Sequence, residues 1–86
     1  MAEYAISTIE KKIIATIADI SGIDPGILSK ETSLVNDLSL DSLSLFEIVI
    51  ELETFYDLRI SDEEIESLKT IGEVVAFISD QLKQKK

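Results

Sequence analysis

The sequence predicts an all-α fold, a small four-helix bundle of three longer helices and one short helix, with a long loop between the first and second helices. Three observations predict it. Only three glycines and one proline occur among 86 residues, and these two residue types disfavour helix interiors most. Apolar residues recur at helical spacing in several segments. A Ser or Thr precedes a Glu by three residues at three places, which is the capping-box pattern of a helix start: Ser7–Glu10, Ser61–Glu64 and Thr70–Glu73.

The first helix is expected from about Ser7 to Ser21. Its apolar residues form one stripe at helical spacing, namely Ile9, Ile13, Ile17 and Ile20. Gly22 follows, and glycine is the usual residue just beyond a helix end. The sequence therefore predicts a helix of about four turns that ends at this glycine.

Residues 22–40 are expected to form a long surface loop. They include the only proline, Pro25, among Asp, Ser, Thr, Lys and Asn residues, with room for a single helical turn. A loop of this length is uncommon in so small a domain and is often functional.

The second helix is expected from Asp41, a good N-cap, to Asp57. Its apolar residues are too many for one stripe. The core face is expected to consist of Leu45, Ile48, Val49, Leu52, Phe55 and Tyr56. A second apolar face, interspersed with carboxylates, consists of Leu43, Phe46 and Ile50. A domain of this size can hardly cover both faces, so the second face is expected to meet a partner. A crowded core helix is the alternative.

Two further helices complete the predicted bundle. A short helix is expected between Asp62 and Leu68. The last helix is expected from about Thr70 to Lys83, with its core stripe formed by Ile71, Val74, Val75, Ile78 and Leu82. Lysines at its C-terminus complement the helix dipole: Lys83, Lys85 and Lys86.

Charge and composition exclude several classes of function. Seventeen acidic and eight basic residues give a formal charge of −9, which disfavours nucleic acids and anionic membrane surfaces. No cysteine or histidine is present, which excludes thiol nucleophiles, imidazole bases and zinc sites of the Cys/His type. We expect residues 1–86 to form a single monomeric domain that is not an enzyme. No export signal or membrane-inserting segment is recognised, so a cytoplasmic location is expected.

Ser42 is the residue expected to carry chemistry. It would be the first residue inside the second helix, where free backbone N–H groups and the helix dipole favour a negatively charged group. No histidine can activate its hydroxyl, and the nearest lysine in sequence is Lys30. Ser42 is therefore interpreted as a site of modification rather than a catalyst. A calcium loop is excluded because Ser42 stands where that loop needs Gly, and Ile48 stands where it needs Glu.

Beyond these single residues, the chain resembles the acyl carrier protein family over nearly its whole length. The matching segments are Asp37–Leu43, which opens the second helix, then Phe46–Val49, Glu51–Glu53, Phe55–Glu64 and Ile71–Ile78. The short motif around Ser42 is common by itself, but together with these matching segments it is specific to the family.

The resemblance implies that Ser42 carries a 4′-phosphopantetheine, transferred from coenzyme A by a separate phosphopantetheinyl transferase that recognises Asp41. The chain would then carry acyl groups as thioesters between enzymes of fatty-acid or related lipid or polyketide-like biosynthesis. The family docks on basic patches of these enzymes through positions that correspond here to Leu43, Phe46, Glu47, Ile50 and Glu53.

Two alternatives remain open at this stage. One is an aminoacyl or peptidyl carrier with the same arm, and the other is an unmodified acidic helical interaction module in which Ser42 only belongs to a helix start. Ser44 and Thr54 stand where many family members have an acid, so a carrier dedicated to a particular pathway stays open beside the housekeeping fatty-acid carrier.

Overall fold

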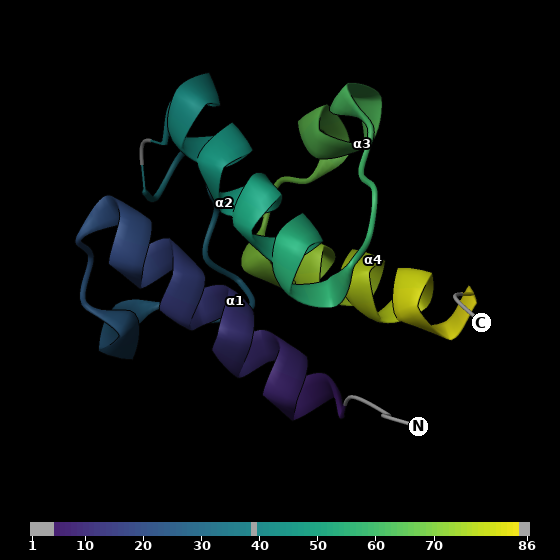
Figure 1. The fold of residues 1–86 in the computed structure, drawn as a ribbon. Coiled ribbons are helices and arrows are strands. Elements are labelled where there is room, and N and C mark those ends of the chain that lie inside the picture. Colours follow the sequence, from purple (N-terminus) through teal and green to yellow (C-terminus); the bar gives the residue numbers. More distant parts are fainter. Residues whose placement is uncertain (1–4, 39, 85–86) are drawn as a thin grey trace.

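The computed structural model describes residues 5–38 and 40–84 and contains four α-helices and one short 3₁₀ helix in those ranges (Figure 1). The elements are α1 (Ile6–Ser21), η1 (Pro25–Ile27), α2 (Ser42–Tyr56), α3 (Asp62–Ser67) and α4 (Ile71–Gln84). The predicted bundle of three longer helices and one short helix, with a long loop after the first, is confirmed. Lys85 and Lys86, expected at the end of the last helix, lie outside the described residues.

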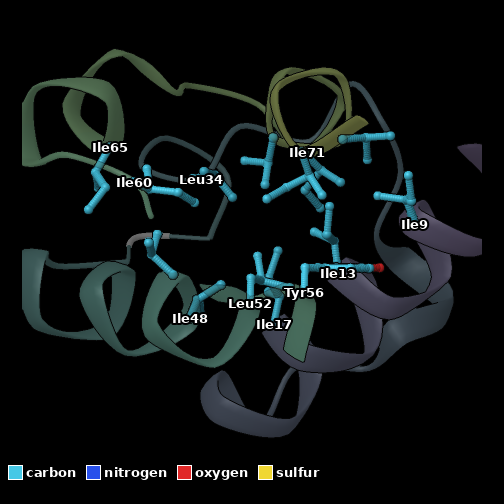
Figure 2. Close-up of a cluster of buried hydrophobic side chains, with 14 of the residues drawn as sticks. Ile9, Ile13, Ile17, Leu34, Ile48, Leu52, Tyr56, Ile60, Ile65 and Ile71 are labelled. Atoms are coloured by element: carbon cyan, nitrogen blue, oxygen red, sulfur yellow. The ribbon is translucent and has the colours of Figure 1, made fainter. Parts of the chain in front are cut away.

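The helices enclose one apolar core. α1 packs against both α4 and α2, and the short α3 packs against α2 (Figure 1). Isoleucines from α1, α2, α3 and α4 point into the shared interior (Figure 2). The largest fully buried side chains are Ile9, Ile13, Ile17, Leu52, Ile71 and Ile78. Each such side chain contributes about 1.5–3 kcal/mol through burial, so the predicted apolar stripes supply the driving force for folding.

The start of α1 differs from the prediction. α1 begins at Ile6 with Ala5 at the N-cap, and the N–H of Ile9 donates to the carbonyl oxygen of Ala5 at 3.0 Å. Ser7 thus lies inside the first turn with helical backbone angles, whereas an N-cap residue needs an extended backbone. The predicted capping box at Ser7 is wrong. The predicted end is confirmed, since Gly22 adopts φ 77° and donates its N–H to Ala18 at 2.8 Å.

The other two predicted capping boxes fall at helix starts. At α3 the box is complete: the Glu64 N–H donates to Ser61 Oγ at 3.2 Å, and the Ser61 N–H donates to Glu64 Oε1 at 2.9 Å. At α4 only one half forms as predicted, with the Glu73 N–H donating to Thr70 Oγ1 at 3.2 Å. The Glu73 carboxylate accepts instead the N–H of Lys69, at 2.7 Å.

A short ladder of backbone hydrogen bonds ties the long loop to the start of α4. Leu34 N–H donates to the carbonyl oxygen of Lys69 at 2.8 Å, and Ile71 N–H donates to that of Thr32 at 3.1 Å. An isolated antiparallel bridge pairs Ser33 with Thr70. The loop before α2 is thus held in place by backbone contacts that lie between two non-neighbouring parts of the chain.

Phe55 does not belong to the core, contrary to the prediction. Its side chain is 52% exposed, whereas Leu52 is fully buried. A helix turns about 100° per residue, so Phe55 lies about 60° to one side of Leu52, at the edge of the buried arc. There the ring accepts a cation–π contact from Lys12, whose Nζ lies 4.1 Å from the ring centroid, and packs edge-on against Tyr56.

None of the helices within the described ranges has the length and apolar character that crossing a membrane requires.

Candidate functional site

The site is built around the first turn of α2. Ser42 is the first helical residue, as predicted, and Asp41 is the N-cap. Asp41 Oδ1 accepts the N–H of Ser44 at 2.9 Å, and the carbonyl oxygen of Asp41 accepts the N–H of Leu45 at 3.0 Å. These two bonds fix the helix start and thereby the position of the Ser42 side chain.

The pKa of the Asp41 carboxyl is lowered from its ordinary value. The largest cause is the hydrogen bond from the backbone N–H of Ser44, followed by the Ser44 side chain. Hydrogen bonds to the charged form favour that form. Asp41, which directly precedes Ser42, is a carboxylate at neutral pH, and these bonds keep it ionised at lower pH than an ordinary Asp.

The hydroxyl of Ser42 is accessible and uncommitted. The residue is exposed and its side chain makes no hydrogen bond to any described residue. As the first residues of α2, Ser42 and Leu43 have N–H groups without acceptors inside the helix, and such groups attract anions. An exposed hydroxyl at a helix start fits the attachment of a phosphate-linked group, and no residue in the described ranges is hydrogen-bonded to it as an activating base would be.

The loop that leads to Ser42 is compactly folded. Asp37 Oδ2 accepts the N–H of Ser33 at 2.8 Å, and the N–H of Leu40 donates to the carbonyl oxygen of Leu34 at 3.2 Å. Leu34 is buried and anchors this turn in the core. Ser39, in the middle of the predicted motif, lies outside the described residues. The loop thus reaches α2 from a fixed direction.

One exposed apolar residue of this loop was not singled out from the sequence. Val35 follows the buried Leu34, yet its own side chain is 56% exposed. An apolar residue within a polar turn is the signal that could have drawn attention to it. It adds apolar surface to the loop that precedes the site.

The second apolar face of α2 is exposed, as the sequence predicts. Leu43 and Ile50 are 67% and 58% exposed, Phe46 is half-buried, and Glu47 is exposed beside them. Large apolar side chains rimmed by charge are typical of an interaction surface. We call Leu43, Phe46, Glu47 and Ile50 the α2 face.

Glu53 differs from the other residues expected on this face. It is half-buried, and its Oε2 accepts the backbone N–H of Ile60 at 2.6 Å. This bond connects α2 to the segment that leads into α3. The carboxylate therefore has a structural role, and it stands at the edge of the α2 face rather than in its middle.

Two spaces adjoin these elements. The interior holds a small apolar cavity of about 10 Å³, lined by the four helices and the loop, which is no more than one water molecule needs. Ile48, Ile65 and Leu34 converge there (Figure 2). An open polar hollow of about 560 Å³ lies at the α2–α3 connection, lined by Glu53, Leu58, Arg59, Ile60, Ser61 and Glu64. In the part of the chain that the structure describes, no group of three or more acidic, His or Cys side chains is arranged to hold a metal ion.

The comparison with protein families assigns the chain. Residues 11–78 match the family model described as "Phosphopantetheine attachment site". Curated relatives agree: the chain is 44% identical over 73 residues to the meromycolate extension acyl carrier protein of Mycobacterium tuberculosis, which covers 80% of this chain and 64% of that protein. It is 34% identical over 80 residues to an acyl carrier protein of Amoebophilus asiaticus, which covers 93% of this chain and 100% of that protein.

Solved structures give the same assignment. An acyl carrier protein from Enterococcus faecalis superposes with a TM-score of 0.77 at 28% identity, covering 91% of this chain and 99% of that one. A structure described as an acyl carrier protein of M. tuberculosis superposes with a TM-score of 0.78 at 38% identity, covering 84% of this chain and 96% of that one. The chain spans 64% of the length of the meromycolate extension protein of M. tuberculosis.

Proposed function

Because the chain belongs to the acyl carrier protein family, we propose that it carries acyl groups as thioesters on a 4′-phosphopantetheine arm attached to Ser42. The observation that carries this proposal is the exposed, uncommitted Ser42 hydroxyl at the first position of α2. The chain itself performs no turnover. It presents its cargo to enzymes that do.

Three features of the chain would hold the arm. The Ser42 hydroxyl forms the covalent link, and the free N–H groups at the start of α2 stabilise the negative charge of the phosphodiester. The hydrogen bond from the Leu40 N–H to the carbonyl oxygen of Leu34, at 3.2 Å, fixes the backbone just before this attachment point. The bound arm supplies a thiol, the group that this cysteine-free chain lacks and that thioester chemistry requires.

Asp41 is proposed to present the site to a phosphopantetheinyl transferase. Its carboxyl is ionised at neutral pH, and the hydrogen bond from the Ser44 N–H lowers its pKa further from the ordinary value. An ionised group next to the acceptor hydroxyl gives the transferase a negative charge at a fixed position to recognise.

The α2 face is proposed to dock acyl-transferring and chain-modifying enzymes through basic patches. Leu43, Phe46 and Ile50 supply apolar contact, and Glu47 supplies charge. Glu53 contributes at the edge of the face through its charge. Electrostatic attraction of this kind raises association rates more than it tightens binding, which suits a carrier that must leave each enzyme quickly.

A lipid-type acyl cargo is the proposed substrate class. Several similar proteins are named for meromycolate extension, which supports an acyl rather than an aminoacyl cargo. We propose a cytoplasmic location, with which the lack of cysteine is compatible. We propose a monomer, since the α2 face must stay open for successive enzymes.

The test is the intact mass of the protein after incubation with coenzyme A and a broad-specificity phosphopantetheinyl transferase. We expect the parent chain to gain one phosphopantetheinyl group, and Ser42→Ala to gain none while it keeps the same thermal unfolding midpoint. Ser44→Ala is the matched control, because Ser44 lies in the same helical turn, and it should still be loaded.

A folded parent chain that gains no mass with its cognate transferase would refute the carrier proposal. An interaction module, in which Ser42 is not modified, would then explain the α2 face better. Loading of Ser42→Ala would place the attachment elsewhere and refute the assignment of the site.

A further inference from the structure

The open hollow at the α2–α3 connection contains one basic residue, Arg59. It is the only basic residue between Lys30 and Lys69 in a chain of charge −9. Arg59 is exposed, and it forms no ion pair or hydrogen bond with any residue in the described ranges. Its guanidinium therefore offers its donors to a group outside the chain.

The two glutamates of the hollow are already engaged. Glu53 Oε2 accepts the N–H of Ile60 at 2.6 Å, and Glu64 Oε1 accepts both the N–H and the hydroxyl of Ser61, at 2.9 and 3.1 Å. Both carboxylates thus stabilise the backbone that forms the hollow. Neither of them neutralises Arg59 by direct contact.

The hollow continues the α2 face. Phe46, Ile50 and Glu53 follow one another at i, i+4 and i+7 along α2, and residues at this spacing share one edge of a helix. Glu53 lines the hollow. A surface that begins at Leu43 therefore reaches Arg59 at the far end of α2, and a 15-residue helix is about 22 Å long.

This surface carries side chains of both charges, and Arg59 is the basic one among acidic neighbours. Glu47 and Glu51 are exposed on the middle of α2, whereas Arg59 stands beyond its C-terminal end. A partner surface that is basic along its whole length would be attracted at Glu47 and repelled at Arg59. Like charges placed opposite each other in an interface disfavour the wrong partner.

From this arrangement we propose that Arg59 is a specificity-determining residue that pairs with a carboxylate on the partner enzymes, the cognate phosphopantetheinyl transferase included. The partner surface is basic opposite Glu47 and acidic opposite Arg59, and an arginine binds a carboxylate through two parallel hydrogen bonds. The contact fixes the orientation of the partner along α2. This inference rests on the proposed carrier function.

The experiment measures kcat/KM for loading of Ser42 by the cognate transferase at low salt, with coenzyme A as the donor. Arg59→Gln should lower kcat/KM about threefold and Arg59→Glu about tenfold, because the first loses the ion pair and the second adds repulsion. Lys11→Glu is the matched control, since it makes the same charge change at an exposed position on α1, and it should stay within about twofold of the parent.

A second measurement tests the contact directly. Arg59→Lys keeps the charge and provides an amine that a carbodiimide couples to a carboxylate in contact with it. We expect a crosslink between residue 59 of this variant and an acidic residue of the transferase, located by mass spectrometry. Lys11, present in the same sample, should give none.

The possible outcomes distinguish the proposal for Arg59 from the proposed carrier function. If Arg59→Glu is loaded as fast as Lys11→Glu, or faster than the parent, the partner has no carboxylate at this place and the inference is wrong. That result would leave the carrier function intact, because the parent is still loaded. If the parent chain is not loaded at all, the carrier function itself fails.

Discussion

The N–H of Gly72 donates to the carbonyl oxygen of Lys30 at 2.9 Å, so the first turn of α4 holds the long loop that leads to Ser42. The two backbones approach so closely that a Cβ on Gly72 would lie 3.1 Å from that carbonyl oxygen and 3.2 Å from Lys30 Cβ. The start of α4 thus lies so close to the loop that any residue larger than glycine at position 72 would displace the loop backbone.

Gly72→Ala is expected to destabilise the fold. Alanine favours a helix over glycine by up to about 1 kcal/mol, but the added methyl group must push away a carbonyl that is already hydrogen-bonded, and overpacking costs about 1–3 kcal/mol. We expect a net loss of about 1 kcal/mol in the free energy of unfolding, measured by urea denaturation. A gain in stability would show that the loop yields freely at this point.

Gly22→Ala is expected to destabilise the fold for a different reason. Gly22 adopts φ 77°, and a Cβ there would meet no atom within 4 Å. The cost is therefore that of the left-handed backbone alone, about 1–2 kcal/mol for a residue with a Cβ. Gly22→Asn should cost less, since Asn tolerates this conformation. Equal losses for the two variants in urea denaturation would contradict this explanation.

The stabilisation supplied by Asp41 should depend on pH. Because its pKa is lowered in the folded protein, its stabilising contribution is full above the unfolded value of about 3.9 and is lost as the pH falls through the folded pKa. Asp41→Asn keeps a side chain that can cap the helix but does not titrate. The urea midpoint of the parent should approach that of Asp41→Asn as the pH falls from about 5 to about 3.

The control for this titration is Ser42→Ala, which removes a neighbouring side chain that does not titrate and leaves the bond between Asp41 and Ser44 in place. Its difference from the parent should not change over the same pH range. If the difference between parent and Asp41→Asn stays constant down to pH 3, the hydrogen bond from Ser44 does not stabilise the charged form.

Substitutions at two neighbouring positions of α2 should affect stability and docking separately. Leu52 is fully buried, so Leu52→Ala should cost about 2–5 kcal/mol of unfolding free energy. Ile50 is 58% exposed on the α2 face, so Ile50→Asp should change stability by only about 0.5 kcal/mol. The same variant should lower kcat/KM for loading about tenfold, because it places a charge in the apolar part of the interface.

Ile27→Asp is the matched control for Ile50→Asp. Ile27 is also a highly exposed isoleucine, but it belongs to η1 and lies outside the α2 face. Its loading by the transferase should match that of the parent. If both variants lose the same activity, added negative charge rather than docking explains the effect.

Much of the site could be predicted from the sequence because its signals are local. Asp41 as N-cap, Ser42 as first helical residue and Gly22 as helix end each depend on backbone preferences that act within one turn. The exposed α2 face could be predicted because helical periodicity separates Ile50 from Leu52 on opposite sides.

Other features could not be predicted from local sequence patterns, because they depend on packing between distant segments. The start of α1 is a local exception: Ser7 matches a capping box, but Ala5 is the N-cap and α1 begins at Ile6. Phe55 matches the core period, but it lies at the edge of the buried arc, where Lys12 of α1 covers its ring.

The sequence by itself determined the helices, their order and the serine at the start of α2, since short-range preferences and apolar periodicity fix these. The tertiary structure alone decided which charged side chains of α2 and its C-terminal connection remain available. Glu53 binds the backbone N–H of Ile60, whereas Glu47 and Arg59 remain exposed. The reason is physical: a charged side chain is committed by the polar groups that folding brings within hydrogen-bond distance, and those groups come from other parts of the chain.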